Sequence, residues 1–189
     1  SEMCIRDSSR ASQQEQEQTR PTPHPSNYKD SPFSMDSLTK LRLAGREGKK
    51  KANINNENKP LFKKILNLSK TEIDLFSAKK QIELFTIFAN WNRIPPKEWS
   101  DVLFNAMGSR LENWDPNQFR FFASALKLTP QQLPKDFLDK YTELFLLKFD
   151  QFNVQTKLEV LAAELIHGRF FDQKQMSVLL QSTTHSLHS

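Results

Sequence analysis

The sequence predicts an all-α protein, an α-solenoid of two-helix units with a 38-residue period. Two observations carry this prediction. From Pro60 onward, apolar and aromatic residues return at the same positions of the period. The residue types that start and end helices return in the same register. A fixed period of roughly 20 to 50 residues is typical of repeat proteins.

The apolar positions of the period recur without a gap. Within the first half of each unit their spacing suits one face of a helix with about 3.6 residues per turn. The second half carries a shorter set of the same kind. The recurring sets are Leu61, Trp99 and Phe137; Ile65, Leu103 and Tyr141; Ile73, Leu111 and Phe149; Phe76, Trp114 and Phe152; Leu84, Phe122 and Val160; and Ile87, Ala125 and Ala163.

The second helix of each unit is expected to begin after an N-cap residue and to end at a helix breaker. A cap side chain accepts a hydrogen bond from a first-turn amide. Pro116 follows its cap where a missing N–H costs nothing. Asp115 and Gln118 resemble a capping box, and Trp114 is placed to pack on Phe119. The caps are Ser77, Asp115 and Asn153, and the breakers are Asn92, Pro130 and Gly168.

These signals divide the folded part of the chain into units. Matched columns of a solenoid pack on one another, so the aromatic residues Trp99, Trp114, Phe137 and Phe152 are expected to be buried between neighbours. The repeat domain is predicted at residues 59–181, with units at about 59–96, 97–134 and 135–170, a partial unit at 171–181, and a flexible tail at 182–189.

The chain ahead of the repeats is polar. Residues 9–58 are rich in Gln, Pro, Ser, Lys and Asn, a composition typical of disorder, and Met35–Leu43 is expected to form no more than a transient helix. Residues 1–8 resemble the translation of a transposase sequencing adapter. We interpret them as a library artefact rather than a natural terminus, so that the true start of the protein is missing.

One stretch resembles a known family. The segment Ile94-Pro95-Pro96-Lys97-Glu98-Trp99 and the following SRLENWDPNQFRFFASALKL are similar to an octotricopeptide repeat, a unit related to the helical repeats of FAST-kinase-like organellar proteins. The resemblance extends over the three units, from position 59 to position 168, and is strongest in the middle unit. It departs from the family pattern at Lys148, which stands where the pattern has Arg.

The resemblance implies a function. Members of the family bind organellar RNA and control its processing, stability or translation, in mitochondria or chloroplasts. We therefore expect a single-stranded RNA partner and a location in one of these organelles. The alternative is a protein–protein scaffold of the same fold in a large organellar assembly. A contiguous positive concave face would favour RNA, whereas a mixed or apolar groove would favour the scaffold.

Catalysis is not expected. The chain has four glycines, so it offers no glycine-rich phosphate loop. Its four histidines are scattered, and its single cysteine, Cys4, lies in the adapter-like segment. We therefore predict no catalytic residue, no metal site, no cofactor and no small-molecule substrate. No apolar run reaches the roughly 18 residues that would suggest a membrane span.

Two rows of cations are candidates for contact with the RNA backbone. Stacked units would align cations that occupy the same position of the period along one edge, where they could follow a chain of phosphates. A solvated lysine at a helix start remains the alternative interpretation. The first row is Lys59, Lys97 and Lys135, and the second is Arg110 and Lys148.

A third column is a candidate for contact with bases. It is polar in every unit but differs between units, as expected of base-reading positions, although an unconstrained surface position would look the same. It consists of Lys79, Asn117 and Gln155. Phe121, whose column otherwise holds glutamate, is a candidate stacking platform. The charge balance weakens the RNA hypothesis, because residues 59–168 carry 15 Lys and Arg against 13 Asp and Glu, a net of +2.

Overall fold

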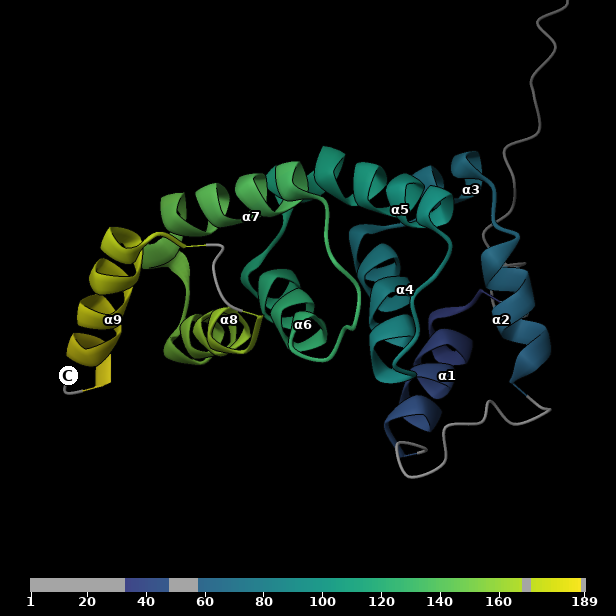
Figure 1. Cartoon of the computed structure of the whole chain (residues 1–189), viewed down its shortest axis with the longest axis horizontal. Coiled ribbons are helices and arrows are strands. Elements are labelled where there is room, and N and C mark those ends of the chain that lie inside the picture. Colours follow the sequence, from purple (N-terminus) through teal and green to yellow (C-terminus); the bar gives the residue numbers. More distant parts are fainter. Residues whose placement is uncertain (1–32, 48–57, 168–170, 188–189) are drawn as a thin grey trace, which may run out of the picture. The chain divides into compact units, whose positions relative to one another are not determined.

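The computed structural model describes residues 33–47, 58–167 and 171–187 (Figure 1). These residues belong to one compact unit and contain no β-strand, which confirms the all-α prediction. The adapter-like residues 1–8 and most of the lead at 9–58 lie outside the described residues. The helices are α1 (Met35–Glu47), α2 (Lys59–Leu66), α3 (Lys70–Leu75), α4 (Ala78–Asn90), α5 (Lys97–Arg110), α6 (Pro116–Leu126), α7 (Lys135–Leu147), α8 (Val154–His167) and α9 (Gln173–Leu187).

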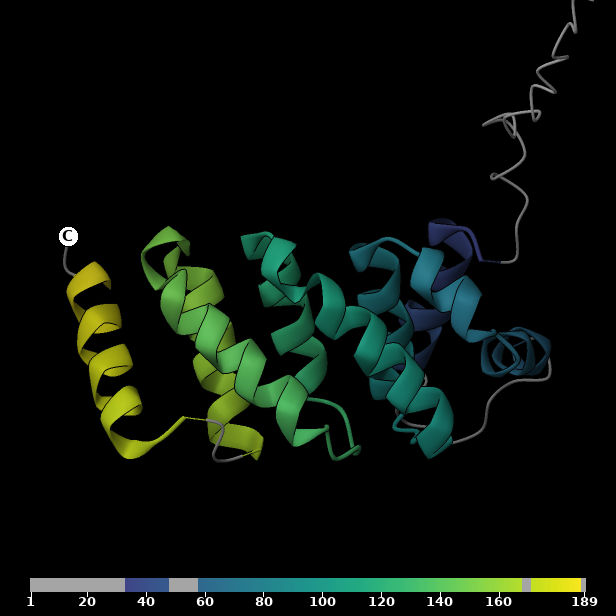
Figure 2. The same cartoon turned by 90° about the horizontal axis from the view of Figure 1, so that it is seen from above.

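The helices lie in two rows (Figures 1 and 2). In one row α1, α4, α6 and α8 pack side by side in that order, and in the other α3, α5 and α7 follow one another. Consecutive helices of the two rows run in opposite directions. Trp99 at the start of α5 contacts Phe88 at the end of α4, with ring centroids 5.1 Å apart. Arg110 at the end of α5 reaches the carbonyl of Phe76, just before α4 begins.

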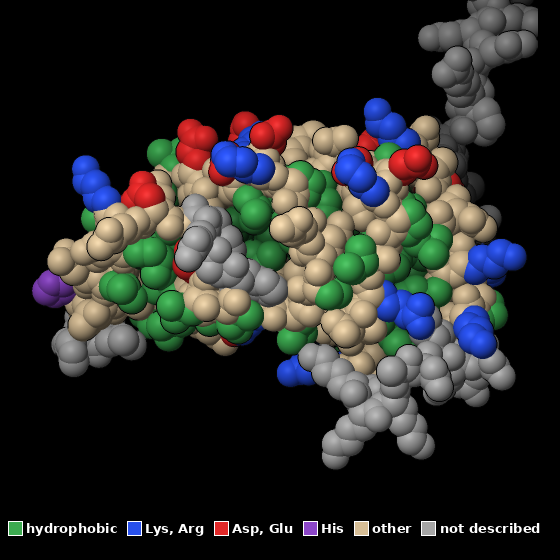
Figure 3. Space-filling model, viewed as in Figure 1, with side chains coloured by type: hydrophobic (Ala, Val, Ile, Leu, Met, Phe, Trp, Pro, Cys, Tyr) green, Lys and Arg blue, Asp and Glu red, His purple; other side chains and the backbone are tan. Residues whose placement is uncertain are grey.

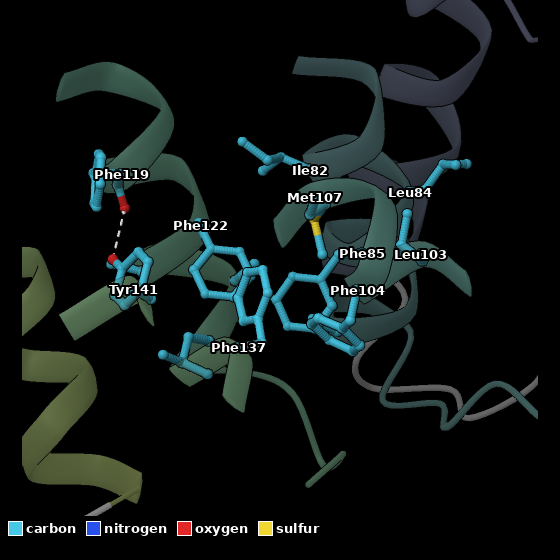
Figure 4. Close-up of a cluster of buried hydrophobic side chains, with 14 of the residues drawn as sticks. Ile82, Leu84, Phe85, Leu103, Phe104, Met107, Phe119, Phe122, Phe137 and Tyr141 are labelled. Atoms are coloured by element: carbon cyan, nitrogen blue, oxygen red, sulfur yellow. Dashed lines mark hydrogen bonds between the residues drawn. The ribbon is translucent and has the colours of Figure 1, made fainter. Parts of the chain in front are cut away.

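An aromatic core fills the space between the rows (Figure 4). Phe85 of α4 stacks on Phe122 of α6 with centroids 5.0 Å apart, and Phe119 stacks on Tyr141 of α7 at 5.2 Å. The Tyr141 hydroxyl donates a hydrogen bond to the Phe119 carbonyl at 3.2 Å, and burial raises the pKa of this phenol. Large buried aromatic side chains dominate the stability of such a core.

The predicted inter-unit aromatics are buried. Exposed fractions are 7% for Trp99, 2% for Trp114, 6% for Phe137 and 4% for Phe152. Trp114 also packs edge-on against Phe119 at 5.7 Å, as the sequence predicted.

The predicted N-caps are confirmed. The Ser77 hydroxyl accepts from the Lys80 amide at 3.3 Å. The Asp115 carboxylate accepts from the Gln118 amide at 2.8 Å, within a complete capping box. The Asn153 side-chain oxygen accepts from the Thr156 amide at 2.9 Å. The three helices therefore begin where the caps predicted, at positions 78, 116 and 154.

The first unit departs from its prediction, because its first helix is broken in two. Ser69 caps α3 by accepting from the Glu72 amide, and the Glu72 carboxylate accepts from the Ser69 amide at 2.8 Å. The second bond, with a further bond from the Ser69 hydroxyl, lowers the pKa of Glu72. A cap with this strength starts a new helix. The corresponding residues of the next units, Met107 and Phe145, are buried apolar side chains that continue their helices.

The prediction that residues 9–58 lack fixed structure is wrong for α1. Leu38 and Leu41 are buried against α4, with exposed fractions of 0% and 2%. The Trp91 indole donates to the Leu41 carbonyl at 2.8 Å. Gly45 allows that approach, because a Cβ there would lie 2.5 Å from Trp91 Cδ1. These tertiary contacts stabilise a helix that its polar sequence alone did not predict.

The predicted flexible tail at 182–189 is also wrong in part, because α9 continues to Leu187. Thr183 is buried, and its hydroxyl donates to the Leu179 carbonyl at 2.7 Å. The Thr184 hydroxyl makes the equivalent bond to Leu180. Threonine satisfies its hydroxyl within the helix in this way, so the polar composition of the segment does not end α9.

Candidate nucleic-acid interface

The first predicted cation row lies at helix starts, as expected. Lys59, Lys97 and Lys135 begin α2, α5 and α7 and are exposed. Lys97 pairs with Asp101 at 2.6 Å, and Lys135 pairs with Asp139 at 2.5 Å. The hydrogen bond from Lys135 to Asp139 raises the pKa of this lysine. Both pairs are solvent-exposed and therefore weak, but they reduce the positive potential along this row.

The two members of the second predicted row, Arg110 and Lys148, each donate to backbone carbonyls of the protein itself. The Arg110 guanidinium donates to the carbonyls of Phe76 and Asp74, at 2.7 and 2.6 Å. Lys148 Nζ donates to the carbonyl of Glu112 at 2.5 Å and also lies 3.5 Å from that of Trp114. In each case the cation binds the carbonyls of a short stretch of backbone that precedes α4 or α6. Both side chains thus join neighbouring parts of the fold.

The third predicted column lies on the surface. Lys79, Asn117 and Gln155 are exposed in the first turns of α4, α6 and α8. Arg120 Nη1 donates to Gln155 Oε1 at 2.7 Å. The Arg120 guanidinium also lies 5.2 Å from the ring centre of Phe121, which is 50% exposed.

The lysine row and this column lie at opposite ends of packed helices. Because α5 runs antiparallel to α4, Lys97 lies beside the end of α4 and Lys79 lies at its start. A helix of 13 residues is about 20 Å long at 1.5 Å per residue. Lys97 and Lys79 are therefore separated by roughly the length of α4.

The structure instead brings two predicted residues into a groove of about 700 Å³ between α1, α4 and α6. Phe121 and Lys79 contribute to its wall, together with the cations Arg42, Arg46 and Lys127. Its apolar lining comes from Met35, Ile82, Ala125 and Leu128, and its other polar lining from Asp36, Thr39, Glu83, Thr86, Asn90, Gln118, Ser124 and Glu159.

Two ion pairs lie in this groove. Arg42 pairs with Glu83 at 2.7 Å, linking α1 to α4. Lys127 pairs with Glu159 of α8, which also accepts from the Ser124 hydroxyl at 3.2 Å. Arg46 and Lys79 are exposed and have no ion-pair partner among the described residues. A ligand with negative charge would therefore meet these two cations first.

Sequence reasoning missed Arg42 and Arg46, because it did not predict α1. A signal was present: Leu38 and Leu41 are three residues apart, as on one helix face, and Arg42 and Arg46 are four apart on another.

Charge is distributed unevenly along the described residues. Residues 33–47 and 58–96 carry ten Lys and Arg against five Asp and Glu, a net of +5. Residues 97–134 carry four of each, and residues 135–167 carry four against six. Figure 3 shows basic side chains without acidic neighbours around the end formed by α2, and alternating signs over the α5–α7 row. The groove at α1 and α4 lies in the basic part.

Within the part of the chain that is described, no group of three or more His, Cys, Asp or Glu side chains could hold a metal ion. None of the described helices is both long and apolar enough to cross a membrane. Comparison with protein-family models, with curated proteins and with solved structures found no match.

Proposed function

We propose that this chain is the RNA-binding segment of an organellar RNA-processing, RNA-stability or translation factor, built as an α-solenoid of 38-residue units. The observation that carries the proposal is the groove between α1, α4 and α6, where a half-exposed Phe121 shares a wall with the cations Arg46 and Lys79. The organelle, mitochondrion or chloroplast, rests on the octotricopeptide resemblance alone.

The register of the helices supports the repeat part of the proposal. Helices α4, α6 and α8 begin at one position of the 38-residue period, and α2, α5 and α7 begin at another. The bonds of Arg110 to the carbonyls of residues 74 and 76 recur one period later in Lys148. A solenoid unit contacts only its neighbours through such recurring junctions.

In the proposed complex, a single RNA strand lies across the row formed by α1, α4, α6 and α8. Phosphates contact Arg46 and Lys79, and one base stacks on Phe121. A stacked base contributes about 1–3 kcal/mol without strong sequence preference. Asn117 and Gln155 lie further along the same row, on the next helices, and contact bases beyond the groove. Lys59, Lys97 and Lys135 add a weaker electrostatic attraction.

The test is a binding titration with a labelled single-stranded RNA of mixed sequence across a salt series. Replacing Arg46 and Lys79 with alanine should weaken binding to every RNA and reduce the salt dependence by about two ions, each worth ~0.7 in slope. The matched control is the double change Lys97→Ala and Lys135→Ala. It removes the same charge outside the groove and should lower the slope by less.

The stacking step has its own variant. Phe121→Ala should weaken binding by the loss of one stacked base, roughly 1–3 kcal/mol, and leave the salt slope unchanged. If the chain binds no RNA at low salt, the RNA proposal is wrong. If Phe121→Ala binds as tightly as the parent, RNA does not use the groove.

A second candidate, a protein scaffold, is favoured by one observation. The groove contains two internal ion pairs and an apolar lining, so its charge is mixed rather than strongly positive. Such a surface suits the amphipathic helix of a protein partner, which docks through apolar anchors. Binding of RNA that does not respond to Arg46, Lys79 or Phe121 would leave the groove to this candidate.

A further inference from the structure

Helix α8 carries an aliphatic stripe on its surface. Leu158, Leu165 and Ile166 are 46%, 75% and 60% exposed, and Ala162 lies half-buried between them. Residues four, seven and eight apart share a helix face, so these four side chains form one stripe over more than two turns. Among the side chains whose burial is described, each of the other helices exposes at most two large apolar ones.

In α6, the helix before α8 in the same row, the equivalent face contacts α8. In α6 and just after it, the residues one period earlier are Arg120, Ser124, Lys127 and Leu128, and the first three donate hydrogen bonds to α8. Their acceptors on α8 are Gln155 and Glu159. This face of a helix in the α1, α4, α6 and α8 row is therefore shaped to receive another helix. In α8 the polar donors are replaced by aliphatic side chains, which suit an apolar partner.

We propose that the α8 stripe pairs with the α8 stripe of a second copy of this chain. The argument for this occupant is charge. The exposed surface of α1, at the other end of the row, includes Asp36, Lys40, Arg46 and Glu47. Pairing that surface with the α8 stripe would remove charges from water without partners, which is costly. The stripe itself carries no charge, so two copies of it match.

The order of the side chains suits a two-fold pairing. Leu158 and Ile166 lie four residues on either side of Ala162, about 6 Å along the axis in each direction. When two such helices cross antiparallel at Ala162, Leu158 of each copy meets Ile166 of the other. The small alanine at the centre lets the helices approach. This is the self-complementary contact of a symmetric dimer, in which residue i meets j and j meets i.

Sedimentation equilibrium of the full chain over a range up to about 100 µM tests the pairing, since a weak dimer dissociates in the micromolar range. The parent chain should rise from its monomer mass of 22.0 kDa toward twice that value. Leu165→Arg should remain monomeric at every concentration. Because Leu165 is 75% exposed, its replacement should leave the helical circular dichroism unchanged.

Leu147→Arg is the matched control, because Leu147 is 77% exposed but lies on α7. It should dimerise like the parent. Ala162→Cys in a Cys4→Ser background should form a disulfide between copies under oxidation, since the two-fold axis brings the two Ala162 positions together.

The parent remaining monomeric at the highest concentration, or Leu165→Arg dimerising normally, would overturn the proposal. A dimer in which Ala162→Cys does not cross-link would overturn the two-fold geometry. The RNA proposal is tested separately, through Arg46, Lys79 and Phe121, none of which belongs to the α8 stripe.

Discussion

The two ends of the row formed by α1, α4, α6 and α8 fold alike but present different surfaces. At α1 and α4 the exposed residues are mainly charged, and Arg46 and Lys79 stand beside a groove. At α8 the exposed stripe is aliphatic. Helices at both ends are packed by buried aliphatic and aromatic residues, and capped by Ser, Asp or Asn. The comparison teaches that the core pattern specifies the fold, and that the outward-facing positions are free to specify different partners.

The largest effect is expected from deleting a side chain of the buried core, which both ends of the row share. Trp114 is 2% exposed and packs on four aromatic rings, those of Phe119, Phe122, Phe137 and Tyr141. Trp114→Ala should lower the free energy of unfolding by about 3–5 kcal/mol, as is usual for deleting a buried aromatic. Urea unfolding followed by circular dichroism measures it. A loss below about 1 kcal/mol, ordinary for a surface change, would mean that the two ends do not depend on a common core.

A smaller effect is expected where α1 joins α4. Gly45→Ala should cost about 1–3 kcal/mol, because the new methyl group overlaps the Trp91 indole. The matched control is Gly108→Ala, whose methyl would lie at an ordinary 3.6 Å from Phe137 Cδ2. It should stabilise the protein by about 0.5–1 kcal/mol, because alanine favours helix. Equal effects of the two changes would argue against the close α1–Trp91 contact.

Replacement of Arg110 tests whether this cation has a structural or an RNA-binding role. Its two carbonyl bonds, at 2.7 and 2.6 Å, are partly exposed, so Arg110→Ala should cost about 1–2 kcal/mol of stability. RNA affinity at a temperature where the variant is folded should stay within about twofold, or roughly 0.4 kcal/mol. Thermal unfolding and RNA titration of the same sample separate the effects. Normal stability with weakened RNA binding would restore the sequence-based role of Arg110.

The smallest effect belongs to the exposed pairs at helix starts. Lys97→Ala and Lys135→Ala should each leave the denaturation midpoint nearly unchanged, since their aspartate partners are four residues away on an exposed surface. Chemical denaturation of each single variant provides the measurement. A clear drop in the midpoint of either variant, which an exposed ion pair would not cause, would show that these lysines support the α5–α7 row.

The sequence predicted the helices well where signals were local or periodic. Caps such as Asp115 act within three residues, and buried residues such as Leu84 and Phe122 recur at the 38-residue spacing. Both signals can therefore be read from the sequence alone. The break at Ser69 was missed because a capping box lay inside an otherwise regular apolar pattern. Helix α1 was missed because its stability comes from Trp91 and α4, far away in the sequence.

The candidate site was less predictable than the fold. Lys79 and Phe121 were identified from their columns, but Arg46 came from an unpredicted helix. Arg110 and Lys148 resembled Lys97 and Lys135 in the sequence, since the members of each pair are one period apart. Only the structure separates them, because a backbone carbonyl acceptor leaves no trace in the sequence of the residues that supply it.

Backbone carbonyl acceptors also affect how such a chain can change over evolutionary time. The bonds of Arg110 and Lys148 end on main-chain oxygens, which every amino acid provides. A junction of this kind needs a cation on one side and only the correct backbone path on the other. In the repeat array proposed above, this bond would therefore survive the exchange of one unit for another with the same backbone path.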